Sequence, residues 1–173
     1  MNRTLIALVE DKPGVLNRVA SLFRRRAFNI ESLTVGHTER PGISRMTIVV
    51  DSDRTDVQKV SQHLYKLVNV IQVDDVTEQA AVIRDLALIR VQADSSTRSE
   101  VMQIVDTFRA RVVDVSLDTL MIEVTGTEEK VEGLVDILKP FGVVEMVRTG
   151  RLVMVRGGNG NRNGNKSYMY KEN

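Results

Sequence analysis

The sequence predicts an α+β fold made of two tandem units, because one order of apolar segments occurs twice along its 173 residues. In each unit the order is strand, helix, strand, strand, helix, strand. Short runs of β-branched and apolar residues indicate the strands, and apolar residues spaced three or four apart indicate the helices. This order is typical of the split βαβ, or ferredoxin-like, unit. The hydrophobic content of 42% is sufficient to build a core.

The first unit is predicted over residues 1–78. Its strands are expected at residues 4–9, 29–35, 44–50 and 70–73. The apolar residues that share one face of the first helix are Val15, Leu16, Val19, Leu22 and Phe23, and those of the second helix are Val57, Val60, Leu64 and Leu67. A loop containing Gly36, Pro41 and Gly42 separates the two middle strands.

The second unit is predicted over residues 79–156. Its strands are expected at residues 86–91, 112–116, 120–125 and 143–147. Its helices are indicated by Val101, Ile104, Val105 and Phe108, and by Val131, Leu134, Val135 and Leu138. Residues 157–173 are rich in Gly and Asn and are expected to form a flexible tail. Tyr168 and Tyr170 in this tail are either partner contacts or part of a frayed terminus.

The turn between the first strand and the first helix, Asp11-Lys12-Pro13-Gly14-Val15-Leu16, is a candidate ligand site. Asp11 is placed to cap the helix, Pro13 has no N–H to leave unpaired, and Gly14 allows close approach to the backbone. The free N–H groups and the dipole of a helix N-terminus attract an anion such as a carboxylate. The alternative is an ordinary capped turn with nothing bound. In the second unit Ser95-Ser96 replaces Pro13-Gly14, so no anion turn is expected there.

Composition excludes several classes of function. The 24 basic side chains are nearly balanced by 23 acidic ones, so the chain lacks the excess positive charge that is typical of nucleic-acid binding. No apolar run approaches the roughly 20 residues needed to cross a bilayer, and the first residues do not resemble a secretory signal. We therefore expect a cytoplasmic protein without a membrane partner. The absence of cysteine excludes disulfides, thiolate metal sites and cysteine nucleophiles.

The residues available for catalysis are few. His37 and His63 are the only histidines, and neither has a second ligand at metal-binding spacing. The carboxylate pairs Asp51/Asp53 and Asp74/Asp75 are expected in turns, where solvated or capping roles are commoner than acid–base catalysis. No phosphate-binding Gly-rich loop or nucleophile elbow is present. The sequence predicts a protein with no catalytic residues and no metal site.

The first unit resembles the ACT domain, a ferredoxin-like module that binds amino acids and regulates metabolic enzymes. A longer pattern made of residues 28–35, 44–50 and 64–70 resembles the small regulatory subunits of acetohydroxyacid synthase, also called acetolactate synthase. The likeness extends over nearly the whole chain, because that family also has a second ferredoxin-like domain. Only the Gly/Asn-rich tail lies outside it.

The resemblance implies a homodimeric protein without an active site that binds and activates a large catalytic subunit. That partner carries thiamine diphosphate, Mg²⁺ and FAD, and the small subunit makes it sensitive to a branched-chain amino acid, most commonly valine. The effector would lie between two ACT domains, contacted by Asp11, Lys12, Pro13, Gly14, Val15 and Leu16 of one chain and by Asn29 and Ile30 of the other. Ala27 stands where the family usually has Gly, at a position that often adopts a left-handed conformation.

The chemistry of these residues suits a zwitterion. The turn supplies N–H donors for a carboxylate, Asp11 or Asn29 can accept from the ammonium, and Val15 and Ile30 are expected beside an aliphatic side chain. Two other functions remain open from sequence. One is a free-standing ACT-domain sensor that acts on another enzyme, a transporter or a transcription factor. The other is an enzyme with activity of its own.

Overall fold

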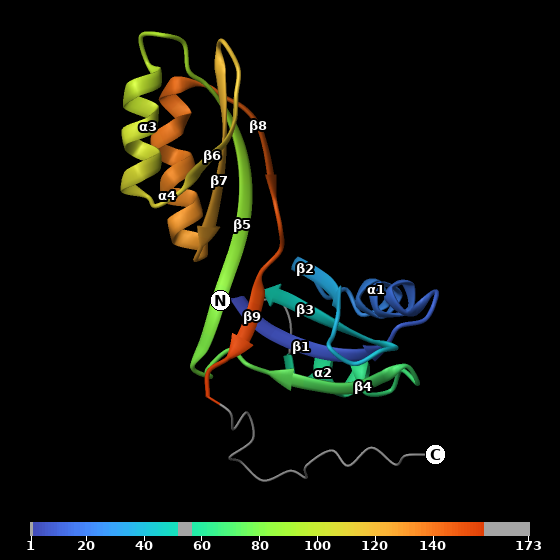
Figure 1. Ribbon diagram of the computed structural model, residues 1–173. Coiled ribbons are helices and arrows are strands. Elements are labelled where there is room, and N and C mark those ends of the chain that lie inside the picture. Colours follow the sequence, from blue (N-terminus) through green and yellow to red (C-terminus); the bar gives the residue numbers. More distant parts are fainter. Residues whose placement is uncertain (1, 52–56, 158–173) are drawn as a thin grey trace.

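The computed structural model describes residues 2–51 and 57–157. Two antiparallel sheets, each with a pair of helices, lie at opposite ends of one long strand, β5 (Figure 1). The predicted α+β fold of two βαββαβ units is confirmed. The expected flexibility of residues 158–173 and the role of Tyr168 and Tyr170 lie outside the described residues. No helix in the described ranges is long and apolar enough to span a bilayer.

The first unit follows the predicted order. It contains β1 (Asn2–Glu10), α1 (Val15–Arg25), β2 (Ile30–His37), β3 (Ile43–Asp51), α2 (Val57–Leu64) and β4 (Val70–Asp75). The strands are arranged β2-β3-β1-β4, so β2 and β4 are the edges of this sheet. β1 pairs with β3 in one continuous register from Asn2 opposite Asp51 to Glu10 opposite Ile43.

Both helices of the first unit cover the same face of its sheet. The buried residues of this core come from every element except β2 and alternate along β1. They are Leu5, Ala7, Val9, Val15, Val19, Leu22, Phe23, Met46, Ile48, Val50, Val60, Leu64 and Val73. The helix predicted through Leu67 ends at Leu64, although Leu67 still packs against the core.

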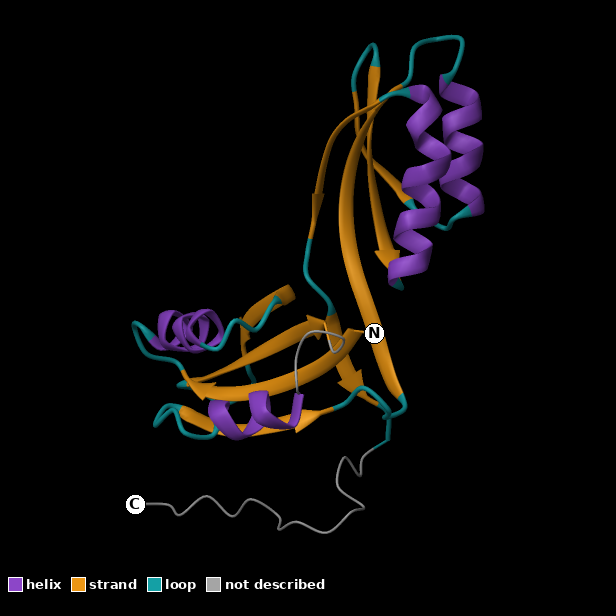
Figure 2. Ribbon diagram, turned by 180° about the vertical axis from the view of Figure 1, so that it is seen from behind, coloured by secondary structure: helices purple, strands orange, loops and turns teal. Residues whose placement is uncertain are grey.

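The second unit repeats this architecture. It contains β5 (Ala81–Gln92), α3 (Arg98–Thr107), β6 (Arg111–Val115), β7 (Thr119–Gly126), α4 (Glu128–Leu138), a short 3₁₀ turn (Lys139–Phe141) and β8 (Val143–Arg148). The strand order is β6-β7-β5-β8. α3 and α4 lie side by side on one face of this sheet (Figure 2).

An additional strand, β9 (Leu152–Val155), was not predicted. It pairs with the first residues of β5, from Ala81 opposite Val155 to Arg84 opposite Leu152. The resulting two-stranded arm packs on the helix-free face of the first sheet, where Ile6, Val76 and Val153 form a small buried cluster. β5 is therefore longer than the predicted 86–91, and its first residues connect the two units.

Candidate functional site

The turn after β1 leaves the N-terminus of α1 without a side-chain cap. Gly14 is the N-cap residue, with φ 83° and ψ −5°, a left-handed conformation that favours glycine. Val15 N–H donates to the Lys12 carbonyl over 3.3 Å. Within the described chain, the N–H groups of Gly14, Leu16 and Asn17 have no hydrogen-bond acceptor. These three donors are available to an anion, as the sequence predicted.

The prediction that Asp11 caps α1 is wrong. Its carboxylate lies 3.2 Å from Nδ1 of His37, and its backbone N–H donates to the Gly42 carbonyl over 2.8 Å. The β1–α1 turn is thereby tied to the loop between β2 and β3. The Asp11–His37 pair is exposed, so it stabilises the fold little and leaves the Asp11 carboxylate accessible to an ammonium group.

A buried amide that sequence reasoning missed holds the turn in place. Nδ2 of Asn69 donates to the Glu10 carboxylate over 2.5 Å, and Oδ1 of Asn69 accepts from Arg18 over 2.5 Å. The Asn69 hydrogen bond and the nearby Lys12 hold the pKa of Glu10 below its usual range. Lys12 Nζ lies 3.2 Å from this carboxylate. The available sequence signal was a lone amide between the apolar residues Val68 and Val70.

Val15 and Leu16 were both expected on the apolar face of the first helix, and only Val15 lies there. Val15 is 4% exposed and belongs to the core, as its helical spacing predicted, and its contact with a ligand's aliphatic side chain stays a prediction. Leu16 was expected to face the core, but it is 45% exposed. Each helical residue is rotated by about 100° from the last, which carries Leu16 away from the sheet. Leu16 is therefore the exposed apolar residue at the start of α1.

A single chain does not bring the turn together with Asn29 and Ile30. Ile30 pairs with Val50, which is also the partner of Arg3, whereas the turn follows Glu10 at the other end of β1. The seven register positions between Arg3 and Glu10 correspond to roughly 23 Å at the usual strand rise. The two halves of the predicted site thus lie at opposite ends of the first sheet.

The segment between α1 and β2 contains a residue with the left-handed backbone conformation that the sequence predicts. Ala27 has φ 52°, which confirms the left-handed conformation predicted for this position. A residue other than glycine there costs roughly 1 kcal/mol. Asn29 is exposed, and its side-chain amide donates to the Glu31 carboxylate. Ile30 is partly buried and packs against the core of the first unit.

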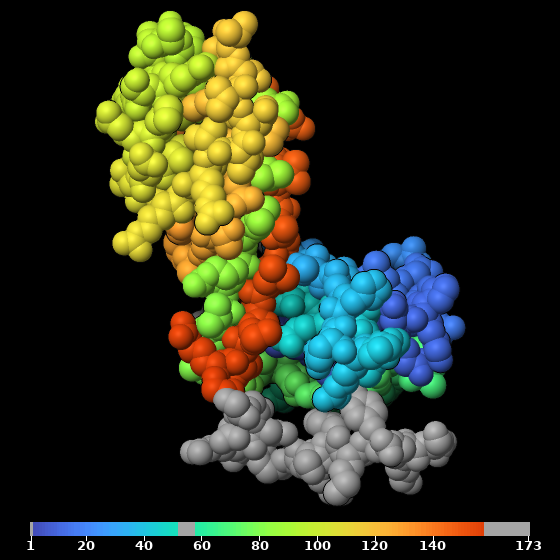
Figure 3. All heavy atoms as spheres, in the orientation of Figure 1, coloured from blue at the N-terminus to red at the C-terminus, as the bar shows by residue number. Residues whose placement is uncertain are grey.

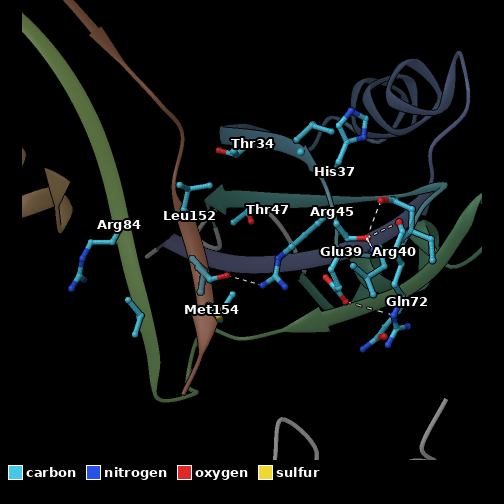
Figure 4. Close-up of a pocket in the computed structure, with 17 residues that line it drawn as sticks. Thr34, His37, Glu39, Arg40, Arg45, Thr47, Gln72, Arg84, Leu152 and Met154 are labelled. Carbon is cyan, nitrogen blue, oxygen red and sulfur yellow. Dashed lines mark hydrogen bonds and ion pairs between the residues drawn. The ribbon is translucent and has the colours of Figure 1, made fainter. Parts of the chain in front are cut away.

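A cavity of about 770 Å³ lies on the other side of the first sheet, between β2, β3 and the arm (Figure 4). Its walls include Thr34, Thr47, Leu152 and Met154, and Arg45 crosses it to donate to the Val153 carbonyl over 2.6 Å. None of the eight predicted site residues lines it. The predicted site residues therefore do not form the cavity, although His37, which lies 3.2 Å from Asp11, is one of its lining residues.

The histidines and paired carboxylates lie apart from one another. His63 packs against Phe28, and its partial burial, with Arg26 and Lys66 nearby, lowers its pKa below the usual value. Asp74 and Asp75 lie in β4 rather than in a turn, and Asp75 pairs with Arg3 at 2.6 Å. Asp53 lies outside the described residues. In the described ranges, no cluster of side chains is suited to hold a metal ion.

In the second domain, a carboxylate of the chain itself accepts hydrogen bonds in the turn before α3. Asp94 accepts from the N–H groups of Ser96 and Thr97 over 2.8 and 3.1 Å, and from the Ser96 hydroxyl over 2.6 Å. These hydrogen bonds hold the pKa of Asp94 below its usual value. Asp94 thus occupies the N–H of Thr97, the N-cap residue of α3, whereas the N–H of Gly14, the N-cap residue of α1, has no acceptor in the described chain.

We expect Asp94→Ala to lower the Tm of the protein at pH 7. The pKa of Asp94 is lower in the folded protein than the ordinary aspartate pKa of 3.8. The stabilisation that Asp94 provides is therefore fully present above pH 3.8 and is lost as the pH falls through the lowered pKa. The difference in Tm between the variant and the wild type should therefore shrink in acid. Asp114→Ala, which removes an exposed carboxylate from β6, is the control. A Tm difference that persists at low pH would contradict this role.

Comparisons with known proteins agree with this architecture. A model described as an AHAS small subunit-like ACT domain matches residues 5–72, and one described as the small subunit of acetolactate synthase matches residues 84–157. A probable acetolactate synthase small subunit of Archaeoglobus fulgidus is 54% identical over 157 residues, covering 91% of this chain and 98% of that protein. The acetolactate synthase small subunit of Bacillus subtilis is 45% identical over 168 residues, covering 96% of this chain and 98% of its own length.

The similarity includes the three-dimensional structure. The crystal structure of the acetolactate synthase small subunit from Thermotoga maritima superposes with a TM-score of 0.84 and 40% identity, covering 91% of this chain and 98% of that one. Sequence and structure therefore agree over both domains, and the chain belongs to the family of acetolactate synthase small subunits.

Proposed function

We propose that this chain activates the large catalytic subunit of an acetolactate synthase and makes it subject to feedback inhibition by a branched-chain amino acid, with valine as the first candidate. The observation that carries the proposal is the uncapped N-terminus of α1, where three backbone N–H groups are free within an exposed turn. In the second domain Asp94 accepts from the N-cap N–H of α3, that of Thr97, whereas the N-cap N–H of α1, that of Gly14, remains free for a ligand.

The turn matches the chemistry of an aliphatic amino acid. The N–H groups of Gly14, Leu16 and Asn17 would hold the carboxylate, and the positive end of the α1 dipole favours its charge. The accessible Asp11 carboxylate would accept from the ammonium group. The exposed side chain of Leu16 would contact the aliphatic part of the ligand.

A second copy of the chain would complete this site. β2 is an edge strand, so its free backbone groups can pair with β2 of another copy. Antiparallel pairing about a twofold axis would place Ile30 of one chain near His37 of the other, because these residues are the two ends of β2. His37 adjoins Asp11, so Asn29 and Ile30 of the second copy would approach the turn. The dimer would thus unite the halves that one chain keeps apart.

In this proposal the chemistry belongs to the large subunit. We assign thiamine diphosphate, Mg²⁺ and FAD to that partner, and regulation alone to this chain, within a cytoplasmic holoenzyme. The roles of the ionisable groups support the assignment. His63 is held against Phe28 and Asp75 is paired with Arg3, so both serve the fold of the ACT domain.

Reconstitution tests the function. The purified chain alone is expected to form no acetolactate, whereas saturating amounts should stimulate pyruvate turnover by its own large subunit. Added valine should then reverse the stimulation. Unchanged turnover on adding the chain would contradict the proposal. Binding of valine without any effect on the large subunit would instead identify a free-standing sensor, and turnover by the chain alone would identify an enzyme.

A further inference from the structure

The segment between β8 and β9, residues 149–151, crosses β2 of the ACT domain in close contact (Figure 1). A Cβ atom at Gly150 would lie 2.6 Å from Oγ of Ser32, 3.1 Å from the Leu33 carbonyl oxygen and nearer still to Oγ1 of Thr34. Gly150 is not among the glycines with positive φ. Glycine is therefore required here by the close approach of two segments, and not by its own backbone conformation.

Arg151 contacts both domains. Its backbone N–H donates to Oγ of Ser32 over 3.2 Å, and its guanidinium donates to Oγ1 of Thr4 over 3.3 Å. The same guanidinium pairs with Glu128, the first residue of α4 in the second domain. Its side chain is only 17% exposed. One residue thus connects the ACT sheet to a helix of the second domain.

The crossing segment is fixed on the side of the second domain. Thr149 N–H donates to the Leu86 carbonyl over 2.9 Å, and Leu86 N–H donates to Oγ1 of Thr149 over 3.1 Å. Arg148 pairs with the buried Asp85 at 2.5 Å. In the space-filling view the segment lies directly between the two units (Figure 3). A displacement of β2 must therefore move this segment or break its contacts.

The contacts with β2 begin two residues after Ile30. Ser32 and Thr34 belong to the same strand that carries Ile30 and that follows Asn29, the two residues assigned to the ligand in the completed site. An effector bound to Asn29 and Ile30 would act on the start of β2, and Gly150 and Arg151 are placed to receive that displacement. Packed elements of this kind can carry coupling between distant sites.

We propose that residues 149–151 form an interdomain latch that transmits effector binding from β2 to the second domain, with Gly150 and Arg151 as its positioning residues. The latch stays closed in both regulatory states and acts as a rigid connection. The inference rests on the proposed function, because it names the route by which effector binding reaches the rest of the holoenzyme.

The first test opens the latch by steric conflict. Gly150→Val adds methyl groups where even Cβ does not fit. In the reconstituted holoenzyme we expect the maximal inhibition by valine to fall at least twofold. Stimulation of the large subunit without valine should change less than twofold. The affinity of the small subunit alone for valine, measured by calorimetry, should also change less than twofold. Gly133→Ala is the matched control, because its Cβ would meet nothing nearer than 3.5 Å, and it should behave as wild type. A purely structural role would lower stimulation and affinity as well.

The failures of the two proposals are distinguishable. A wild-type chain that neither stimulates nor confers inhibition would remove the proposed function. A wild-type chain that does both, beside a folded Gly150→Val chain inhibited to the same extent, would overturn the latch alone.

Variants of Arg151 give an independent measurement. Arg151→Ala should weaken maximal inhibition, and Arg151→Lys, which retains the charge facing Glu128, should restore part of it. Full inhibition in Arg151→Ala would also count against the latch.

Discussion

Gly14→Asp is expected to raise the valine concentration for half-inhibition of the reconstituted holoenzyme by more than a hundredfold, while stimulation is retained. The substitution places a carboxylate at the N-cap of α1, beside the N–H groups that would hold the ligand. This carboxylate fills the site and repels the carboxylate of valine. A loss of about 3 kcal/mol of binding free energy corresponds to more than two orders of magnitude in affinity.

Two controls separate charge from backbone strain. Gly14 and Gly157 have φ values of 83° and 81°, and a Cβ at either would meet nothing within 4 Å. Gly157→Asp thus adds the same charge and similar strain far from the turn, and it should leave inhibition unchanged. Gly14→Ala adds strain without charge. Its valine concentration for half-inhibition is expected to lie between those of the wild type and Gly14→Asp. An unshifted inhibition curve for Gly14→Asp would mean that the turn has only a structural role.

Arg148→Met is expected to lower the free energy of unfolding by about 3–5 kcal/mol, because it leaves a buried carboxylate without its counterion. The Asp85 side chain is 5% exposed, and Arg148 approaches its Oδ2 atom to 2.5 Å. The other carboxylate oxygen, Oδ1, is buried without a hydrogen-bond partner in the described chain. Urea denaturation at a single protein concentration measures the loss.

The same pair of strands supplies the control. Arg90 and Glu145 also join β5 to β8, at 3.1 Å, but they are exposed, so Arg90→Met should cost no more than about 1 kcal/mol. Replacing both buried partners, in Asp85→Val with Arg148→Met, should restore much of the stability because no unpaired charge remains. Equal losses for Arg90→Met and Arg148→Met would contradict the assigned cost of the buried charge.

Most of the fold was predictable because each domain buries one face of each helix and strand. Val19, Leu22 and Phe23 lie in the core as their helical spacing required. β9 was not predictable from periodicity, since its four residues, Leu152–Val155, have no polar alternation. Its pairing with β5 depends on a contact between segments some 70 residues apart. The end of α2 at Leu64 was missed because Leu67 remains an apolar core contact after the helix ends.

The candidate site was predictable in its backbone and less so in its side chains. The open N-terminus of α1 follows from a Gly before an amphipathic helix, and the structure has this feature. The side-chain roles depended on tertiary partners that sequence does not give. Asp11 turns toward His37 instead of capping α1, and Asn69 supports the turn from the start of β4. Val15 lies in the core, which leaves Leu16 as the exposed apolar residue.

The N-terminus of α1 is expected to bind the carboxylate of a branched-chain amino acid. Titration of valine into the ¹⁵N-labelled full-length chain, followed by amide chemical shifts, measures this binding residue by residue. We expect saturable shifts at Gly14, Leu16 and Asn17, whereas Ser96 and Thr97 should be unaffected because Asp94 already occupies their N–H groups. Shifts confined to the cavity around Thr34, Thr47 and Met154, with none at the turn, would contradict this expectation.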